Sequence, residues 1–183
     1  GAELTFVGEF SNLTTTAVIT TPVTIKGDNA VINNMAFSIW ANDVTLTNMT
    51  FVATTSVGDL IGINANGVTV SNLDITYTVG DESAIAINAV GVEDVTIFNN
   101  TILFESHASQ DGKDANAINL DTVTNAIVDA NKVTASITGV DADYGRSGLY
   151  NRFGMMGVNT VNPIRIVECE AVEFTNNEID ASL

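Results

Sequence analysis

The segment Val95-Thr96-Ile97-Phe98-Asn99-Asn100-Thr101-Ile102 has a pattern that recurs along most of the chain, and this repetition indicates the fold. Apolar residues alternate with polar ones, one or two asparagines follow, and an apolar residue closes the segment. Further copies begin at Val44, Val68, Ala126 and Val172, and a degenerate copy begins at Val23. A period of roughly 20 to 50 residues indicates stacked repeats, because one repeat cannot bury its apolar face alone.

Each copy has the periodicity of a β-strand. Apolar side chains at every second position, such as Val68 and Val70, place one face of the strand against a core. A second short apolar strand precedes each copy, as in Leu60-Ile61-Gly62-Ile63, and a turn rich in Asn and Gly joins the two strands. Equivalent strands of successive copies must then be parallel and in register. We predict an all-β right-handed parallel β-helix, a solenoid of about six coils.

The recurring asparagines fall at one predicted corner of this solenoid. Stacked side-chain amides can donate to one neighbour and accept from the other, as in cross-β ladders. Asparagine also tolerates the left-handed backbone that a corner requires. We therefore predict a structural ladder through Asn48, Asn72, Asn99 or Asn100, Asn131, and Asn176 or Asn177.

The charge of the chain excludes several classes of partner. The 183 residues contain six Lys and Arg against 22 Asp and Glu, which gives a net charge of −16. Such a surface repels nucleic acid and offers no basic patch to anionic lipids. No apolar run reaches the ~18 residues of a membrane span. We expect no nucleic-acid partner, no membrane insertion by this piece, no cofactor and no metal site, and a location outside the cell or at its surface.

The chain is expected to form one domain, residues 1–183. Residues 1–22 are predicted to form an N-terminal cap, and residues 23–183 the coils. Gly1 resembles an expression scar, and the last residues directly follow a repeat. These features favour a fragment of a longer protein.

Four linkers, residues 52–59, 76–83, 105–116 and 137–162, occupy the same position in successive repeats. Insertions gathered on one side of a solenoid often form its binding face. The two long loops, 105–116 and 137–162, hold the single histidine and two of the three tyrosines. The ligand-binding residues predicted there are His107, Asp111, Lys113, Asp143, Tyr144, Arg146, Tyr150 and Arg152.

Three interpretations of these loops stay open. Tyrosines with arginines and acids suit a sugar or a protein partner. Alternatively, the longer loop covers the core as a lid. The third is catalysis, for which a hydrolase needs two carboxyl groups at a set separation and a lyase needs a strong base.

The segments 23–30, 42–48 and 95–102 resemble right-handed parallel β-helix repeats of the pectin-lyase-like superfamily. More narrowly, they are similar to adhesin-like surface proteins of archaea, particularly gut methanogens. The resemblance implies a non-enzymatic binding module that recognises a glycan or a surface protein of another cell. The alternative is a carbohydrate-active enzyme, either a polysaccharide lyase or a glycoside hydrolase. The Gly-His-Gly and Arg-Ile-Lys motifs of polygalacturonases are absent from the chain. A third reading is a stalk that only sets distance from the cell.

Overall fold

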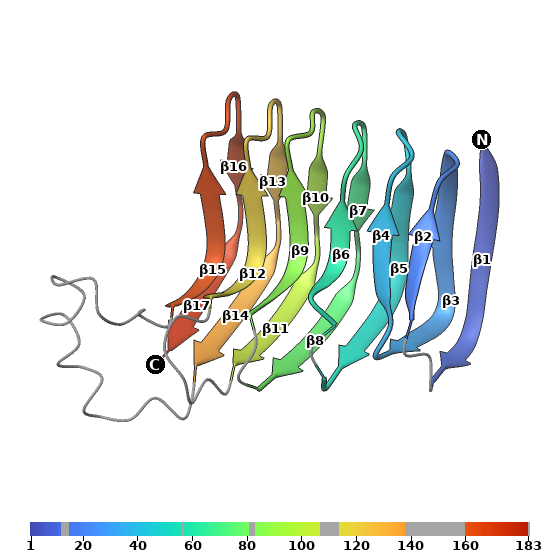
Figure 1. The fold of residues 1–183 in the computed structure, drawn as a ribbon, viewed down its shortest axis with the longest axis horizontal. Helices are drawn as coiled ribbons and strands as arrows, with labels where there is room; N and C mark the ends of the chain where they lie inside the picture. Colours follow the sequence, from blue (N-terminus) through green and yellow to red (C-terminus); the bar gives the residue numbers. More distant parts are fainter. Residues whose placement is uncertain (12–14, 56, 81–82, 107–113, 138–159, 183) are drawn as a thin grey trace, which may run out of the picture.

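Figure 1 shows the computed structural model, which describes residues 1–11, 15–55, 57–80, 83–106, 114–137 and 160–182. Within these residues every regular element is a β-strand, and every strand pair is parallel. Consequently, the described part of the chain has no helix that could cross a lipid bilayer. The predicted all-β class and the parallel pairing of equivalent strands are confirmed.

One sheet has eleven strands and is strongly curled. Its first members are the long strands β1, β3 and β5, and each later layer contains two shorter strands separated by a corner. In chain order the strands are β1 (Ala2–Phe10), β3 (Val23–Asn33), β5 (Thr45–Ala53), β7 (Thr69–Ser71), β8 (Asp74–Val79), β10 (Thr96–Phe98), β11 (Thr101–Ser106), β13 (Ile127–Asp129), β14 (Lys132–Ile137), β16 (Glu173–Thr175) and β17 (Glu178–Ser182).

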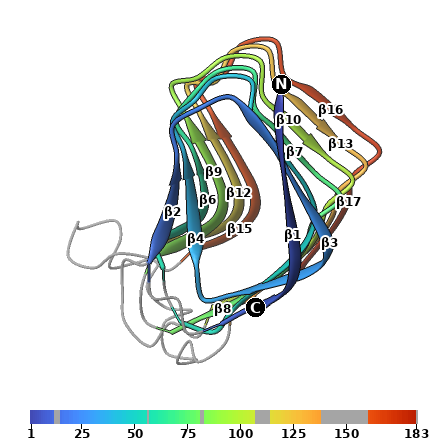
Figure 2. The same cartoon turned by 90° about the vertical axis from the view of Figure 1, so that its right-hand side faces the viewer.

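The second sheet has six strands, and the chain enters it once between successive layers of the first. Its order is the reverse of the chain order, because each new strand adds to the same edge. The strands are β2 (Thr16–Ile19), β4 (Ala36–Ile39), β6 (Asp59–Ile63), β9 (Ala84–Val90), β12 (Asp114–Asp121) and β15 (Thr160–Val167). Viewed along the stack in Figure 2, the two sheets face each other across a shared interior.

The interior is built from rows of apolar side chains that are in register from strand to strand. One row runs through both short and long strands of the curled sheet, and its central members are fully buried: Leu46, Val70, Ile97 and Val128. Ile63, Ala89 and Leu120 form an equivalent row on the second sheet. Fully burying such a side chain contributes about 1.5 to 3 kcal/mol. The period-two pattern of the sequence is thus the pattern of the core.

The corner of the curled sheet contains two rows of asparagines rather than the single ladder expected. The outer row has a left-handed backbone, and it comprises Asn29, Asn48, Asn72, Asn99 and Asn176, with Ala130 as an exception. The inner row is Asn100, Asn131 and Asn177. Asn99 Nδ2 donates to Asn72 Oδ1 over 2.7 Å in the outer row, and Asn131 Nδ2 donates to Asn177 Oδ1 over 2.9 Å in the inner row. Adjacent asparagines such as Asn99 and Asn100 therefore have different roles.

Residues 1–22 contribute a strand to each sheet. β1 pairs with β3 from Ala2 opposite Val23, and β2 pairs with β4 from Thr16 opposite Ala36. The ring of Phe6 packs against Phe10, with 5.0 Å between ring centroids, and against Phe37, at 6.2 Å. That these residues protect the end of the stack stays a prediction.

Candidate functional site

The loop residues predicted to bind a ligand fall outside the part of the chain that the structure describes. They are His107, Asp111, Lys113, Asp143, Tyr144, Arg146, Tyr150 and Arg152. Their predicted role therefore stays a prediction.

The described strands do fix where the linkers begin and end. In the curled sheet the row Val79, Ser106 and Ile137 marks the last residues of β8, β11 and β14. In the six-stranded sheet Asp114 of β12 is opposite Thr160 of β15, and Ala115 is opposite Ala84 of β9. Successive linkers thus leave from neighbouring strand ends and enter neighbouring strand starts, as their spacing in the sequence predicted. The strands extend a few residues into the ranges 105–116 and 137–162.

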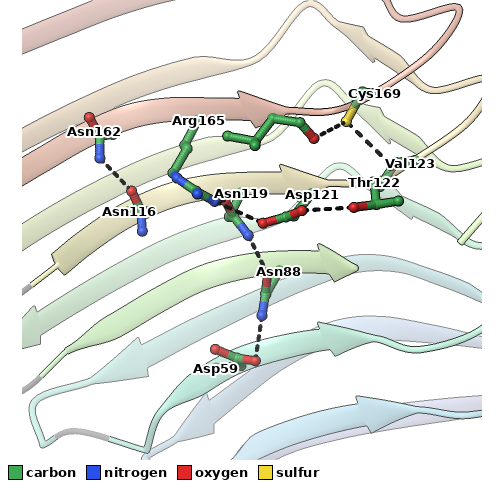
Figure 3. A network of polar contacts seen from close by, with 11 residues as sticks. Asp59, Asn88, Asn116, Asn119, Asp121, Thr122, Val123, Asn162, Arg165 and Cys169 are labelled. Atoms are coloured by element: carbon green, nitrogen blue, oxygen red, sulfur yellow. Dashed lines mark hydrogen bonds and ion pairs between the residues drawn. The ribbon is translucent and has the colours of Figure 1, made fainter. Parts of the chain in front are cut away.

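A run of polar side chains crosses the outer face of the six-stranded sheet, as Figure 3 shows. Asn88 Nδ2 donates to Asp59 Oδ2 over 2.7 Å, and Asn119 Nδ2 donates to Asn88 Oδ1 over 2.8 Å. Arg165 Nη1 donates to Asn119 Oδ1 over 2.7 Å and lies 3.3 Å from Asp121 Oδ2. Four successive strands, β6, β9, β12 and β15, therefore share one continuous polar network.

A hollow of about 330 Å³ lies over this network. It adjoins the strand starts that the linkers enter, since Ser83 and Ala84 are among its lining residues. A second contact, from Asn162 Nδ2 to Asn116 Oδ1 over 2.7 Å, fixes another amide in its wall. The described residues that line it are Asp59, Ser83, Ala84, Ile85, Asn116, Asn119 and Arg165.

Most of the polar lining is already positioned by the protein. Asn116 and Asn119 are buried, so their amides keep one orientation through their hydrogen bonds. Arg165 and Asp121 are partly exposed, and a pair of this kind contributes about 1 kcal/mol or less to stability. The guanidinium is therefore held in place without being essential to the fold.

The same face carries an exposed tryptophan. Trp40 directly follows β4 and is 60% exposed, and its Nε1 donates to Ser38 Oγ over 2.8 Å. Ser38 is in register with Gly62, which is in register with Asn88. Because that row continues to Asn119 and Arg165, the indole lies toward one end of the face and the hollow toward the other.

The described lining of the hollow offers several kinds of polar group. Fixed amides, a carboxylate and a guanidinium offer both donors and acceptors of hydrogen bonds there, and the Trp40 indole offers an apolar platform at the other end of the same face. Asp59 is the single carboxylate in the described lining. Within the described residues, no three His, Cys, Asp or Glu side chains gather where they could hold a metal ion.

The sequence analysis predicted no site on this outer face of the six-stranded sheet. The sequence predicts Arg165-Ile166-Val167-Glu168 as strand, and the first three of these residues lie in β15 whereas Glu168 lies just beyond its end. No further role was predicted for Asn88, Asn119 or Arg165. The available signal is a polar residue between two apolar ones at the same place in three repeats, in Ile87-Asn88-Ala89, Ile118-Asn119-Leu120 and Ile164-Arg165-Ile166.

No protein-family model matches the chain, and comparisons with curated proteins and with solved structures also give no match.

Proposed function

We propose that the chain is a non-enzymatic, adhesin-like binding module that recognises a glycan at the cell surface. Its fold would be a right-handed parallel β-helix of about six coils, related to the pectin-lyase-like superfamily. The observation that carries the proposal is the hollow on the six-stranded sheet, where buried Asn116 and Asn119 and partly exposed Arg165 are fixed side by side.

The strand pairing supports a β-helix. The chain passes alternately between the two sheets, and each pass adds a parallel strand in register with the previous one. Parallel strands joined by crossovers are almost always connected in the right-handed sense. We therefore propose a right-handed solenoid, and its count of about six coils is part of the same proposal.

The form of the hollow favours a glycan over a flat protein surface. Small-molecule sites are concave and contain a few well-placed polar groups, as this one does. Amides that are already hydrogen-bonded lose little further freedom when a ligand binds. Equivalent side chains recur about every 4.8 Å from strand to strand. A chain of sugar rings laid across the strands would thus meet Asn88, Asn119 and Arg165 in turn.

A surface location rests on composition. The chain has few cations and is rich in Asn, Thr and Asp, so its exposed faces repel nucleic acid and anionic lipid. A rigid, polar, strongly acidic solenoid is suited to display a binding face in solvent. The ligand would be presented by another cell or by its matrix.

The experiment is a glycan array on the wild-type protein, followed by calorimetry with the glycans that bind. Arg165→Met keeps the aliphatic stem and removes the guanidinium, so the affinity should fall at least tenfold, which is about 1.4 kcal/mol. Lys132→Met is the control, because Lys132 Nζ forms a more exposed ion pair with Glu178, 3.0 Å away on the other sheet. It should bind as the wild type does, and both variants should melt close to the wild-type temperature.

Two results would contradict the proposal. If no glycan on the array binds, the proposal that the ligand is a glycan is wrong. Release of shorter sugars from polyuronates or neutral polysaccharides, lost in Arg165→Met but kept in Lys132→Met, would instead make the chain a carbohydrate-active enzyme. Tyr150→Ala in the same assays tests the predicted contribution of the long loop.

A further inference from the structure

A second row of outward side chains lines the hollow beside the polar network. Asp59 of β6 is in register with Ile85 of β9, and Ile85 is in register with Asn116 of β12. All three residues line the hollow. The row therefore presents a carboxylate, an aliphatic side chain and an amide, in that order, across three neighbouring strands.

The amide of Asn116 has an unused donor. Asn116 is 4% exposed, and its Oδ1 accepts a hydrogen bond from Asn162 Nδ2 over 2.7 Å. This contact holds the oxygen toward β15, so the nitrogen lies on the side of the amide away from Asn162, as Figure 3 shows. Among the described residues, Asn116 Nδ2 has no acceptor. Because buried polar groups are as a rule hydrogen-bonded, this nitrogen marks a place for an acceptor on a ligand.

Asp59 offers the complementary acceptor on the other side of Ile85. Its side chain is exposed, and its Oδ2 accepts a hydrogen bond from Asn88 Nδ2 over 2.7 Å. Because Asn88 belongs to β9, this contact draws the carboxylate toward β9 and hence toward Asn116. From the described residues no hydrogen bond reaches Asp59 Oδ1. This oxygen is thus available to a donor on a ligand.

The spacing of these two groups suits a single amide group. Neighbouring strands are about 4.8 Å apart, so the backbones of β6 and β12 are about 10 Å apart. In a trans amide the N–H and C=O point in opposite directions. The nitrogen and oxygen of an amide lie about 2.3 Å apart, and two hydrogen bonds of about 2.9 Å extend that span to about 8 Å. An amide with its N–H toward Asp59 and its C=O toward Asn116 therefore bridges the row.

The floor of the hollow restricts what that amide can carry. When N–H and C=O lie along the row, the two carbon substituents of the amide lie across it, one inward and one outward. Ile85 is half-buried and forms the floor, so the inner substituent must be small and apolar. A methyl group meets this requirement, whereas a continuing peptide chain would collide with Ile85. The outer substituent emerges toward solvent, where a sugar ring would contact Asn119 and Arg165.

We infer that the hollow binds the acetamido group of an N-acetylated amino sugar. The amide N–H donates to Asp59, the amide carbonyl accepts from Asn116, and the methyl group packs on Ile85. This inference rests on the proposed glycan-binding function and specifies the class of sugar that the hollow takes. A sugar with a hydroxyl in place of the acetamido group leaves Asn116 Nδ2 unpaired and Ile85 uncovered, so it should bind more weakly.

The test compares sugars that differ in this one group. The probes are the methyl glycosides of N-acetylglucosamine and N-acetylgalactosamine, each paired with the methyl glycoside of glucose or galactose. Titration of the ¹⁵N-labelled wild-type protein, followed by NMR chemical shifts, gives each dissociation constant. In at least one pair the acetylated sugar should bind about tenfold more tightly or better. The side-chain amide of Asn116 should then shift, and saturation transfer from the protein should be strongest at the acetyl methyl group.

Variants of the protein locate the acetamido group. Asp59→Ala removes the acceptor and should lower the ratio of the two dissociation constants of a pair to about one. Asp74→Ala is the matched control, because Asp74 is also an exposed aspartate at the start of a strand, β8 of the other sheet. It should keep the wild-type ratio.

Asn116→Asp nearly preserves the shape of the side chain, and it should also remove the preference, because a carboxylate repels the carbonyl of the sugar. Since Asn116 is buried, circular dichroism must first show that this variant folds. The exposed position of Asp59 keeps the test valid if it does not.

Equal affinity for both members of each pair overturns the inference. The proposed glycan-binding function would still stand in that case if Arg165→Met weakens both affinities. A preference that persists in Asp59→Ala, or that Asp74→Ala reduces equally, also overturns the inference. If no glycan binds in the array or in the titrations, the function and the inference are both wrong. Tighter binding of N-acetylglycine N-methylamide than of either acetylated sugar would assign the site to a peptide instead.

Discussion

Asn100 and Asn131 are hydrogen-bonded to each other inside the protein, with Asn100 Nδ2 donating to Asn131 Oδ1 over 2.9 Å. Each is 1% exposed. Both amides also donate to backbone carbonyls of the preceding layer, Asn100 to Val70 and Asn131 to Ile97. The inner row therefore supplies hydrogen-bond partners for the polar groups buried at the corner. An unpaired donor in such a buried region would lower the stability of the fold by about 1 to 3 kcal/mol.

Asn131→Ala should lower the free energy of unfolding by about 2 to 4 kcal/mol, because it leaves the backbone N–H and the side-chain amide of Asn100 without their acceptor. Urea denaturation followed by circular dichroism measures the loss. Asn99→Gly is the control, since glycine also accepts the left-handed backbone and only an exposed hydrogen bond disappears. Its cost should stay below about 1 kcal/mol. Equal losses in the two variants would contradict a special role for the inner row.

Ala130 interrupts the outer row of asparagines, and its φ of 55° is strained for an alanine. Ala130→Asn should raise the free energy of unfolding by about 1 kcal/mol, because asparagine tolerates this conformation better. The new side chain would also lie in the row of Asn72 and Asn99. Thermal melting measures the gain. Thr134→Asn, on the extended backbone of β14, should bring no gain, because asparagine is disfavoured in strands. A lower melting temperature for Ala130→Asn would contradict the interpretation that alanine is strained at this position.

The fold could be predicted because its main determinant is local and repeated. Alternation of apolar residues marks each strand, and repetition of the alternation specifies that strands such as β7 and β10 pair in register. The division of asparagines into two rows could not be predicted from the pattern alone. Asn99 and Asn100 are adjacent and chemically identical, and the backbone turn at Asn99 decides which of them points inward.

The polar network was harder to foresee for a related reason. Asn88, Asn119 and Arg165 lie 31 and 46 residues apart in sequence, and they meet because β9, β12 and β15 are neighbours in register. Linkers of unequal length hide this relationship in the sequence. Once the register is known, the three residues form a single row on the outer face.

Trp40 is the only tryptophan of the chain, so its fluorescence reports on one site. If glycan lies along the outer face of the six-stranded sheet, binding should shift the emission of Trp40 to shorter wavelength and protect it from quenching by acrylamide. Both effects follow when a sugar ring excludes water from an exposed indole. Asn119→Leu removes the central amide of the network. The glycan affinity measured from the Trp40 fluorescence should therefore fall at least tenfold. Thr134→Val on the other sheet should leave it unchanged. An emission spectrum that stays constant while calorimetry shows binding would place the ligand elsewhere.

The lowered pKa of Asp129 indicates how the stability of the protein changes in acid. Its Oδ1 accepts hydrogen bonds from Thr175 Oγ1 over 2.7 Å and from Asn176 Nδ2 over 2.9 Å. The Thr175 hydroxyl, followed by the Asn176 amide, holds the pKa of Asp129 below its usual value. A carboxyl whose pKa is lowered by folding stabilises the folded state above its unfolded pKa, near 4, and this stabilisation disappears as the pH falls through the lowered value.

Thr175→Val keeps the shape of the side chain and removes its hydroxyl, so the pKa of Asp129 should rise toward that of a free carboxyl. Carbon-detected NMR of the Asp129 carboxyl during an acid titration measures the change directly. The same variant should lose less stability than the wild type between neutral pH and about pH 3, because the carboxylate no longer has its strongest partner. Thr45→Val, in a different row of the same sheet, should leave the Asp129 titration as it is. If Thr175→Val titrates like the wild type, the threonine hydroxyl is not what lowers the pKa, and the contact between β13 and β16 does not contribute to the acid response.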